Sequence, residues 1–528
     1  MRDENRIGEK QSPEVSHDSR PTYVDNIRLF LYNLYKFTLI QDSGDYVMSY
    51  KIIKTAAAGV IGGALLAPAA ALAKTLLTPR KVSGYKPAGD PEREKLYAGK
   101  LSEMVKYETV SVRGEIQRDK FLGFHRVLEK LFPQVHRHLE KTEIDGSLMF
   151  RWEGKRHDRP VVLMGHQDVV AAEGRWIHEP FSGDIADGKV WGRGSGDTKC
   201  SVMAFFQAVE ELLGEGYVPE QDIYLCSSST EEIGGEGAPK TVDELERRGV
   251  RPFLVCDEGG AIIREPMEGF SGYYAMIGVL EKGSGNVKVI ARSGGGHSST
   301  PSPNSPIARL SKFVCDIEKH NPMRSDIEPE LMTMFKRMAD YGPFHMRLAL
   351  GNLWLTKPLL KLAGSHLGSQ VAALMRTTVA FTQQSGSQGA NVLPQEASIT
   401  VNMRYIPHQD KEESIAVIRK IASKYNLEVE DLGGDSSFPP VNTDGEAFHL
   451  VEDVIADVFP GLPVIPYVMT GGTDAAYYQR ICDACIRFSP VLYTEEQMDS
   501  MHGLNENIST VSLPGAVDFY KAVIKKAK

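Results

Sequence analysis

The feature that most restricts the fold of this chain is the alternation of short apolar runs with amphipathic segments between residues 160 and 256. Short apolar runs bounded by polar residues are typical of buried strands, and apolar residues spaced three and four positions apart predict helices. Strands that alternate with helices favour an α/β fold, with a mixed, largely parallel sheet flanked by helices. The expected strands cover residues 160–165, 222–226 and 253–256, and the expected helices cover residues 200–213 and 241–248.

A second pattern begins near residue 283 and predicts a smaller domain inserted into the first one. Strands are expected at residues 286–292 and 397–405, and helices at residues 307–319 and 411–425. This order favours a small α+β domain, which contains an atypical segment rich in Met and Leu at residues 323–381. We therefore divide the globular part into a first domain in two parts, 81–283 and 437–528, and an inserted domain, 284–436.

The N-terminal region needs a separate interpretation. We expect a polar tail at residues 1–47, followed by a signal peptide or membrane anchor at residues 48–80. Residues 55–73 carry no charge, and a helix of this length, about 28 Å, just spans a bilayer core. Ala71-Leu72-Ala73 also matches the cleavage pattern of a signal peptide. Export is therefore expected, either anchored in a membrane or secreted or lumenal, and the alternative is an internal Ala-rich helix.

Composition narrows the functional classes. The formal net charge is −9 at pH 7 and no long basic run is present, so we expect no nucleic-acid partner. Hydrophobic residues make up 42% of the 528 residues, which is ordinary for a globular protein with a sizeable core. Six cysteines in a chain of this length do not indicate a disulfide framework.

Polar side chains follow the apolar runs at the points where the strands should end. The residues at these points are His166, Asp168, Glu231, Glu232 and Asp257. Because ligands bind at the carboxyl ends of strands in open α/β sheets, these side chains should converge. Imidazole with several carboxylates suits zinc, with manganese or cobalt as alternatives. For any one of these residues a solvated surface position is the simpler interpretation, and only the joint pattern predicts a metal centre.

A further carboxylate, Asp197, lies in the Gly-rich loop Gly194-Ser195-Gly196. Carboxylates gathered this densely repel one another, and a pair of divalent cations removes the repulsion. One carboxylate must then bridge two ions about 3.5–4 Å apart. Asp197 suits that role because its neighbouring glycines let the backbone approach closely.

Two pairs of residues close in sequence predict a division of roles at the centre. Glu231 and Glu232 follow each other, so their side chains point in different directions and one can bind metal while the other acts as general base. Asp168 lies two residues from His166 and should orient its imidazole.

Four motifs resemble a known family: VVLMGHQDVV, WGRGSGDTKCSVMA, SSSTEEIGGEGA and VCDEGG. They resemble the M20 family of metallopeptidases, and the carboxypeptidase S-like branch is the most similar part of it. The resemblance runs from about residue 90 to residue 528 and implies a zinc-exopeptidase-like catalytic domain. Members of this branch hydrolyse peptides or N-acyl amino acids.

The resemblance implies roles for individual residues. The implied metal ligands are His166, Asp197, Glu232, Asp257 and His502. Asp197 would bridge the two ions, with His166 and Asp257 on one ion and Glu232 and His502 on the other. His502 enters because Met501 to Asn507 matches the family's HGxNE motif. Glu231 would be the general base and Asp168 the orienting acid.

The same resemblance makes the inserted domain a lid that carries substrate-binding residues and often forms dimers. The implied substrate-binding residues are His297, Asn391, Arg404 and Gly472. His297, in SGGGHSSTP, would help polarise the scissile carbonyl. Arg404, in GANVLPQEASITVNMRY, suits a bidentate grip on a substrate carboxylate. This implies a homodimer through the lid as one partner arrangement.

These inferences predict a zinc-dependent hydrolase that cleaves an amide bond next to a C-terminal amino-acid carboxylate. Two zinc ions are the expected cofactors, and peptides or N-acyl amino acids are the expected substrates. Three alternatives stay open: an N-acyl amino acid hydrolase of the aminoacylase type rather than a peptidase, a non-catalytic relative that kept the fold, and a protein whose role is membrane interaction through residues 55–73. Under the first alternative, the apolar segment 323–381 would line an acyl pocket.

Overall fold

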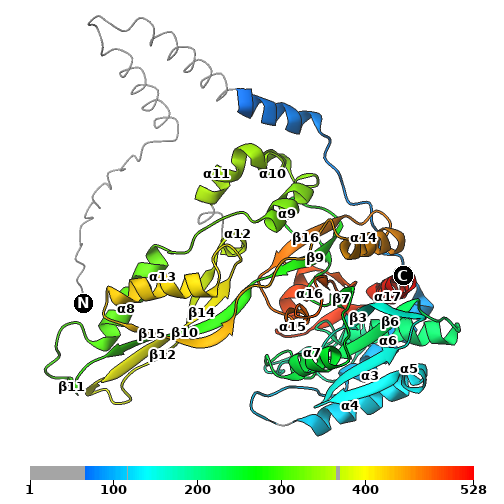
Figure 1. Cartoon of the computed structure of the whole chain (residues 1–528), viewed down its shortest axis with the longest axis horizontal. Coiled ribbons are helices and arrows are strands. Elements are labelled where there is room, and N and C mark those ends of the chain that lie inside the picture. Colours follow the sequence, from blue (N-terminus) through cyan, green and yellow to red (C-terminus); the bar gives the residue numbers. More distant parts are fainter. Residues whose placement is uncertain (1–65, 116, 364–368) are drawn as a thin grey trace, which may run out of the picture. The chain divides into compact units, whose positions relative to one another are not determined.

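The computed structural model describes residues 66–115, 117–363 and 369–528. The chain divides into two compact units, Met1–Ala69 and Ala70–Lys528, and the elements labelled in Figure 1 belong to the second. The predicted polar tail at 1–47 and most of the predicted signal or anchor segment at 48–80 lie outside the described residues. Residues 66–77 are helical. No helix in the described part is both long and apolar enough to cross a membrane.

A mixed sheet of ten strands forms the centre of the larger domain. Its strands are β1 (Glu140–Ile144), β2 (Ser147–Trp152), β3 (Arg156–Met164), β6 (Gln221–Ser227), β7 (Leu254–Asp257), β8 (Ala261–Arg264), β9 (Tyr273–Glu281), β16 (Val464–Met469), β17 (Cys485–Arg487) and β18 (Leu492–Tyr493). They run in the order β1-β2-β6-β3-β7-β17-β9-β8-β18, and β16 also pairs with β9. The pairs β6–β3, β3–β7, β7–β17, β16–β9 and β18–β8 are parallel.

Helices cover both faces of this sheet. They are α3 (Pro91–Val105), α4 (Arg118–Leu131), α5 (Pro133–His138), α6 (Lys199–Gly214), α7 (Gly237–Arg247), α14 (Glu446–Val458), α15 (Ala475–Tyr478), α16 (Glu495–Ser500) and α17 (Leu513–Lys526). Along β3, Val161 and Leu163 join the apolar core that α6 and α17 share, whereas Val162 and Met164 join the core that contains α7. Because successive strand residues point to opposite faces, the sheet is buried between helical layers. The predicted α/β class, with a mixed, largely parallel sheet flanked by helices, is confirmed.

The inserted domain has an antiparallel sheet of four strands, in the order β12-β14-β10-β15. These strands are β12 (Thr378–Ser385), β14 (Glu396–Tyr405), β10 (Gly283–Arg292) and β15 (Glu428–Asp435). Helices α8 (Pro306–Lys319) and α13 (Lys411–Ser423) pack on this sheet through a second apolar core. The strands β11 (Gly296–His297) and β13 (Val392–Leu393) pair separately. The inserted α+β domain is therefore present, while its limits at 284–436 stay a prediction.

The described residues of the Met- and Leu-rich segment include four helices, α9 (Pro329–Ala339), α10 (Phe344–Leu350), α11 (Leu353–Ala363) and α12 (Ser369–Met375). On α9, Leu331, Met334 and Met338 lie in a fourth apolar core together with Ile465 and Val468 of β16. This segment therefore packs against the edge of the central sheet, although it lies within the inserted domain along the chain.

Candidate metal centre

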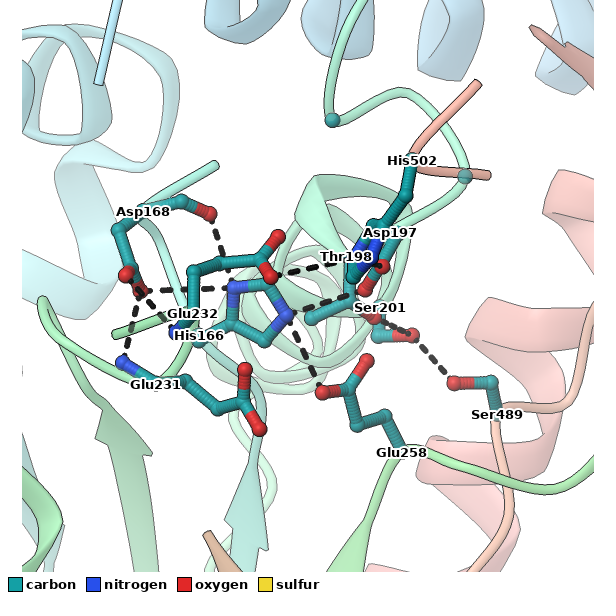
Figure 2. Close-up of polar contacts among 12 residues, drawn as sticks. His166, Asp168, Asp197, Thr198, Ser201, Glu231, Glu232, Glu258, Ser489 and His502 are labelled. Carbon is teal, nitrogen blue, oxygen red and sulfur yellow. Dashed lines mark hydrogen bonds and ion pairs between the residues drawn. The ribbon is translucent and has the colours of Figure 1, made fainter. Parts of the chain in front are cut away.

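Two histidines and three carboxylates meet where parallel strands of the central sheet end (Figure 2). His166 lies two residues beyond β3 and is buried. Its Nε2 atom lies 3.0 Å from Asp197 Oδ1 and 3.1 Å from Glu258 Oε1. These three side chains offer ligand atoms close enough together to hold one metal ion.

A second group forms around His502, which follows α16 near the end of the chain. Its Nε2 atom lies 2.9 Å from Asp197 Oδ2 and 3.1 Å from Glu232 Oε2. The His502 side chain is 56% exposed, so this side of the centre is open to solvent. Asp197 directs one carboxylate oxygen to each histidine, which is the arrangement that a carboxylate bridging two cations requires.

Asp257 lies outside both ligand groups in this structure, and its role as a metal ligand stays a prediction. This residue ends β7, and its Oδ2 atom accepts a hydrogen bond of 2.8 Å from the backbone N–H of Ala475. The next residue, Glu258, lies beside His166 instead. Asp257 still lies close to the centre, because its charge acts on both His166 and Glu258. The sequence signal for Glu258 was its place in the same strand-end motif, Asp257-Glu258-Gly259-Gly260.

Asp168 orients the centre in two ways. Its backbone carbonyl lies 2.8 Å from Nδ1 of His166, which leaves Nε2 of the imidazole facing Asp197 and Glu258. Its carboxylate accepts the backbone N–H groups of Glu231 and Glu232 at 3.2 and 3.1 Å. Asp168 therefore links the histidine to the turn that carries both glutamates, and its carboxylate acts on the turn more than on the imidazole.

The carboxylates at the centre outnumber the histidines, and the pKa values of several of these groups are raised. Burial raises the pKa of Glu231 to about 10 and the pKa of Glu258 to about 8, against the opposing charge of His166. Hydrogen bonds to Asp197 and Glu232 raise the pKa of His502 to about 10. Protons held on these groups offset the repulsion between carboxylates. Divalent cations would replace those protons, so the donor set fits a pair of metal ions.

The loop that carries Asp197 is held by a residue that sequence reasoning did not select, Glu506. Its Oε1 atom accepts the N–H groups of Gly196 and Asp197 at 2.9 and 3.0 Å. Its Oε2 atom accepts the N–H of Gly194 and pairs with Arg193 at 2.8 Å. Both charged side chains are buried, so this pair fixes the position of Asp197 from the far end of the chain. Its only sequence signal was its place in the stretch that contains His502.

Two of the predicted substrate-binding residues lie near the junction of the two domains. Gly472 precedes Thr473, whose N–H donates to the buried carboxylate of Glu281 at the end of β9. Arg404 lies on β14 opposite Ser284 of β10. Its charge acts on Lys282, whose pKa burial lowers to about 7 with further lowering by Arg404. The Arg404 guanidinium therefore lies close enough to the point where β9 leads into β10 to disfavour a second positive charge on Lys282.

The other two predicted substrate-binding residues lie elsewhere. His297 and Asn391 are adjacent, because the N–H of Ser298 donates to the carbonyl of Asn391 at 3.0 Å and β11 pairs with β13. Both residues are exposed, and in Figure 1 β11 lies at the end of the lid sheet remote from β7. The structure therefore brings His297 and Asn391 together but does not bring them to the metal-ligand groups.

Comparisons with known proteins agree with the geometry. Residues 162–526 match the model of peptidase family M20/M25/M40. The chain is 31% identical over 465 residues to the probable carboxypeptidase S-like 2 of Dictyostelium discoideum, covering 86% of this chain and 88% of that protein. It is 33% identical over 447 residues to the N-fatty-acyl-amino acid synthase/hydrolase PM20D1 of Xenopus tropicalis, covering 83% and 87%.

Solved structures show the same fold. The M20 family metallo-carboxypeptidase Sso-CP2 from Sulfolobus solfataricus matches with a TM-score of 0.61 at 18% identity, over 81% of this chain and 98% of that one. A structure of Bacillus subtilis YXEP, described as a dinuclear metal-binding peptidase from the M20 family, matches with a TM-score of 0.50 at 12% identity, over 82% and 98%. With the family match and the relatives above, the chain belongs to peptidase family M20/M25/M40, with carboxypeptidase S-like proteins among its relatives.

Proposed function

We propose that this chain is a two-zinc hydrolase that cleaves the amide bond next to a C-terminal amino-acid carboxylate, in a peptide or an N-acyl amino acid. The observation that supports it most is the shared position of Asp197, whose two oxygens lie 3.0 and 2.9 Å from His166 and His502. A carboxylate between two histidine-containing groups is the ligand pattern of a dinuclear centre.

In the part of the chain that the structure describes, two groups of three side chains could each hold one ion. His166, Asp197 and Glu258 would hold one ion, and Asp197, Glu232 and His502 would hold the other. Nitrogen and carboxylate oxygen ligands suit zinc, and they also accept manganese or cobalt. When bound, such a pair supplies a nucleophilic water at neutral pH and polarises the amide carbonyl.

Glu231 is the proposed general base and acid. Its carboxyl group belongs to neither ligand group, yet it lies in the same turn as Glu232 and beside His166 and Glu258 (Figure 2). Burial raises the pKa of Glu231 to about 10 in the metal-free chain. Cations held by the two ligand groups would lower this pKa, and the Glu231 carboxylate could then take a proton from the attacking water. The same carboxyl then donates that proton to the leaving amine nitrogen. Asp168 keeps Glu231 in place through its backbone N–H.

Arg404 is the proposed anchor for the substrate carboxylate. It lies at the domain junction near Lys282 and Arg376, and the two guanidinium groups there would attract an anionic group of the substrate. Gly472 would line the same junction, since a Cβ there would come within 3.7 Å of Glu281 Oε1. His297 and Asn391 lie away from the centre, so their contact with substrate requires a lid movement or the lid of a second copy in a homodimer.

Two relatives favour a second version of this function. The Xenopus tropicalis relative is named for the synthesis and hydrolysis of N-fatty-acyl amino acids, and the Dictyostelium discoideum relative is named as a probable carboxypeptidase. Both match most of this chain at similar identity, so an N-acyl amino acid hydrolase of the aminoacylase type is the second candidate. Export, with residues 55–73 as anchor or signal, is part of the proposal.

The test combines metal analysis with a substrate panel. We expect about two zinc ions per purified chain, activity that a chelator abolishes, and recovery on adding zinc. Dipeptides and N-acyl amino acids that share one C-terminal residue, each with an amidated counterpart, should be compared. Hydrolysis of the free acids but not of the amidated compounds would support anchoring of the substrate carboxylate. The substrate class that is hydrolysed faster, dipeptides or N-acyl amino acids, would separate the two candidate functions. A chain that binds no metal at neutral pH and hydrolyses neither class would support the non-catalytic alternative.

A further inference from the structure

We propose that the protein docks on a bilayer containing anionic phospholipids through a face made by Lys74, α9 and α11. This α9–α11 face consists of Lys74, Met332, Lys336, Trp354, Lys357 and Lys361. It lines a cavity of about 810 Å³ in the Met- and Leu-rich segment and contains none of the metal-ligand residues. The inference does not depend on the proposed hydrolase activity.

Large apolar side chains on this face are exposed to solvent. The Trp354 side chain is 62% exposed, and Leu359 on the same helix is 65% exposed. Pro358 lies one turn from Trp354 and also lines the cavity. Large apolar side chains grouped beside an open cavity mark an interaction site, and tryptophan favours the interface between lipid and water.

The charged part of the face has one sign. Among the residues that the structure describes, four lysines and no acidic residue line the cavity, although the whole chain has a formal net charge of −9. Asp326 partly offsets two of them, since it lies 2.8 Å from Lys361 and 3.7 Å from Lys357. Lys336 has no acidic partner among the described residues, and Lys74 donates to the backbone carbonyl of Gly351. Lysines around an apolar surface keep their stems in the apolar layer and present their ammonium groups to anionic headgroups.

The position of Lys74 in the chain indicates a membrane rather than another occupant. The uncharged stretch 55–73 ends immediately before Lys74. Lys74 Nζ donates to the carbonyl of Gly351 at 2.8 Å, which ties the residue after this stretch to the turn between α10 and α11. Leu76 and Leu77, which follow, are 66% and 83% exposed. The sequence therefore leads directly from the predicted membrane segment into a residue that lines the α9–α11 face, which favours a bilayer as the occupant.

Tryptophan quenching tests this contact in the full-length chain. The probes are phosphatidylcholine vesicles with brominated acyl chains, with and without phosphatidylserine. We expect the brominated vesicles to quench part of the fluorescence, more strongly with phosphatidylserine, and Trp354→Phe to remove most of that quenching. Trp176→Phe is the matched control, because Trp176 is the other partly exposed tryptophan, while Trp152 and Trp191 are buried. Unchanged quenching in Trp354→Phe would overturn the proposal.

Charge variants test the headgroup part. Lys336→Gln and Lys361→Gln should each raise the concentration of phosphatidylserine vesicles needed for half-maximal quenching by roughly fivefold. Lys319→Gln and Lys420→Gln, at exposed lysines of α8 and α13 without acidic partners in the described part of the chain, should change it little. If the two variants on the α9–α11 face and the two control variants raised this vesicle concentration equally, binding through a specific face would be contradicted. Absence of quenching together with a dimer that Trp354→Phe dissociates, measured by light scattering, would assign the face to a second copy of the chain.

Discussion

Glu258 and Asp257 are neighbours whose roles two substitutions can separate. Glu258→Gln keeps the size of the side chain and removes a carboxylate that lies 3.1 Å from His166 Nε2. It leaves His166 and Asp197 as the remaining ligands of that group. Even outer-shell partners of a metal ligand typically contribute 10-fold to about 100-fold in affinity, so loss of a direct ligand should weaken this ion by about 100-fold or more, or about 2.7 kcal/mol.

Asp257→Asn should behave differently. The amide oxygen of asparagine can still accept the N–H of Ala475, so only the charge assistance of that hydrogen bond is lost. We expect this variant to keep both ions and to lose about 1 kcal/mol of unfolding free energy. The metal-free form of Glu258→Gln should be as stable as the wild type or more stable, because burial already raises the pKa of Glu258 to about 8.

The assay is metal content per chain after dialysis at fixed free zinc, with urea unfolding of the chelated proteins. Wild type and the control Glu236→Gln, an exposed carboxylate beside α7, should hold two ions where Glu258→Gln holds one. If Asp257→Asn lost an ion while Glu258→Gln kept both, the assignment drawn from the structure would be refuted and the original prediction of Asp257 restored.

Four further outcomes are expected. Glu231→Ala should keep its metal and lose about 10²-fold to 10⁴-fold in kcat, and metal loss would contradict its role as base. Glu506→Gln should lower the free energy of unfolding by about 3–5 kcal/mol by leaving Arg193 buried without its partner, and an unchanged urea midpoint would count against this. Arg404→Ala should raise KM about 10-fold or more for free acids but not for carboxamide analogues, and equal changes would exclude carboxylate anchoring. Burial raises the pKa of Glu231 to about 10 and of Glu258 to about 8, so both groups hold their protons more tightly in the folded, chelated protein than in the unfolded chain. Its free energy of unfolding should therefore fall as pH rises from about 5 to about 10, most steeply below about 8, where both groups contribute. A zinc-loaded sample whose stability fell in parallel would contradict the coupling.

Much of the fold could be predicted because its signals are local. The first expected strand, 160–165, lies within β3 apart from its last residue, and the expected helix 200–213 lies within α6. The helix expected at 241–248 begins earlier, at Gly237, because the turn after Glu232 leads directly into α7. The strand β16 was not predicted, because Pro466 interrupts its apolar run and its pairing partner β9 lies far away in the sequence.

Part of the candidate site could also be predicted from local sequence patterns, and part could not. Polar residues after apolar strands could be identified from the pattern, since strand ends converge at one edge of a parallel sheet. The choice between Asp257 and Glu258 could not, because it depends on the residue at which the pleat of β7 ends and thus on which side chain faces His166. The position of His297 could not be predicted either, since it depends on how far the lid sheet extends from the centre.

The sequence by itself determined the layer order, the residue types of the centre and the family to which the chain belongs. These could be identified because hydrophobic periodicity and short motifs are properties of short segments of the chain. Only the tertiary structure decided which groups touch. Glu506 holds the N–H of Gly196 across 310 positions of sequence, and His502 reaches Asp197 from a loop that carries no local signal of its own. Contacts between such distant residues depend on the packing of the whole sheet and its helices, which no local pattern encodes.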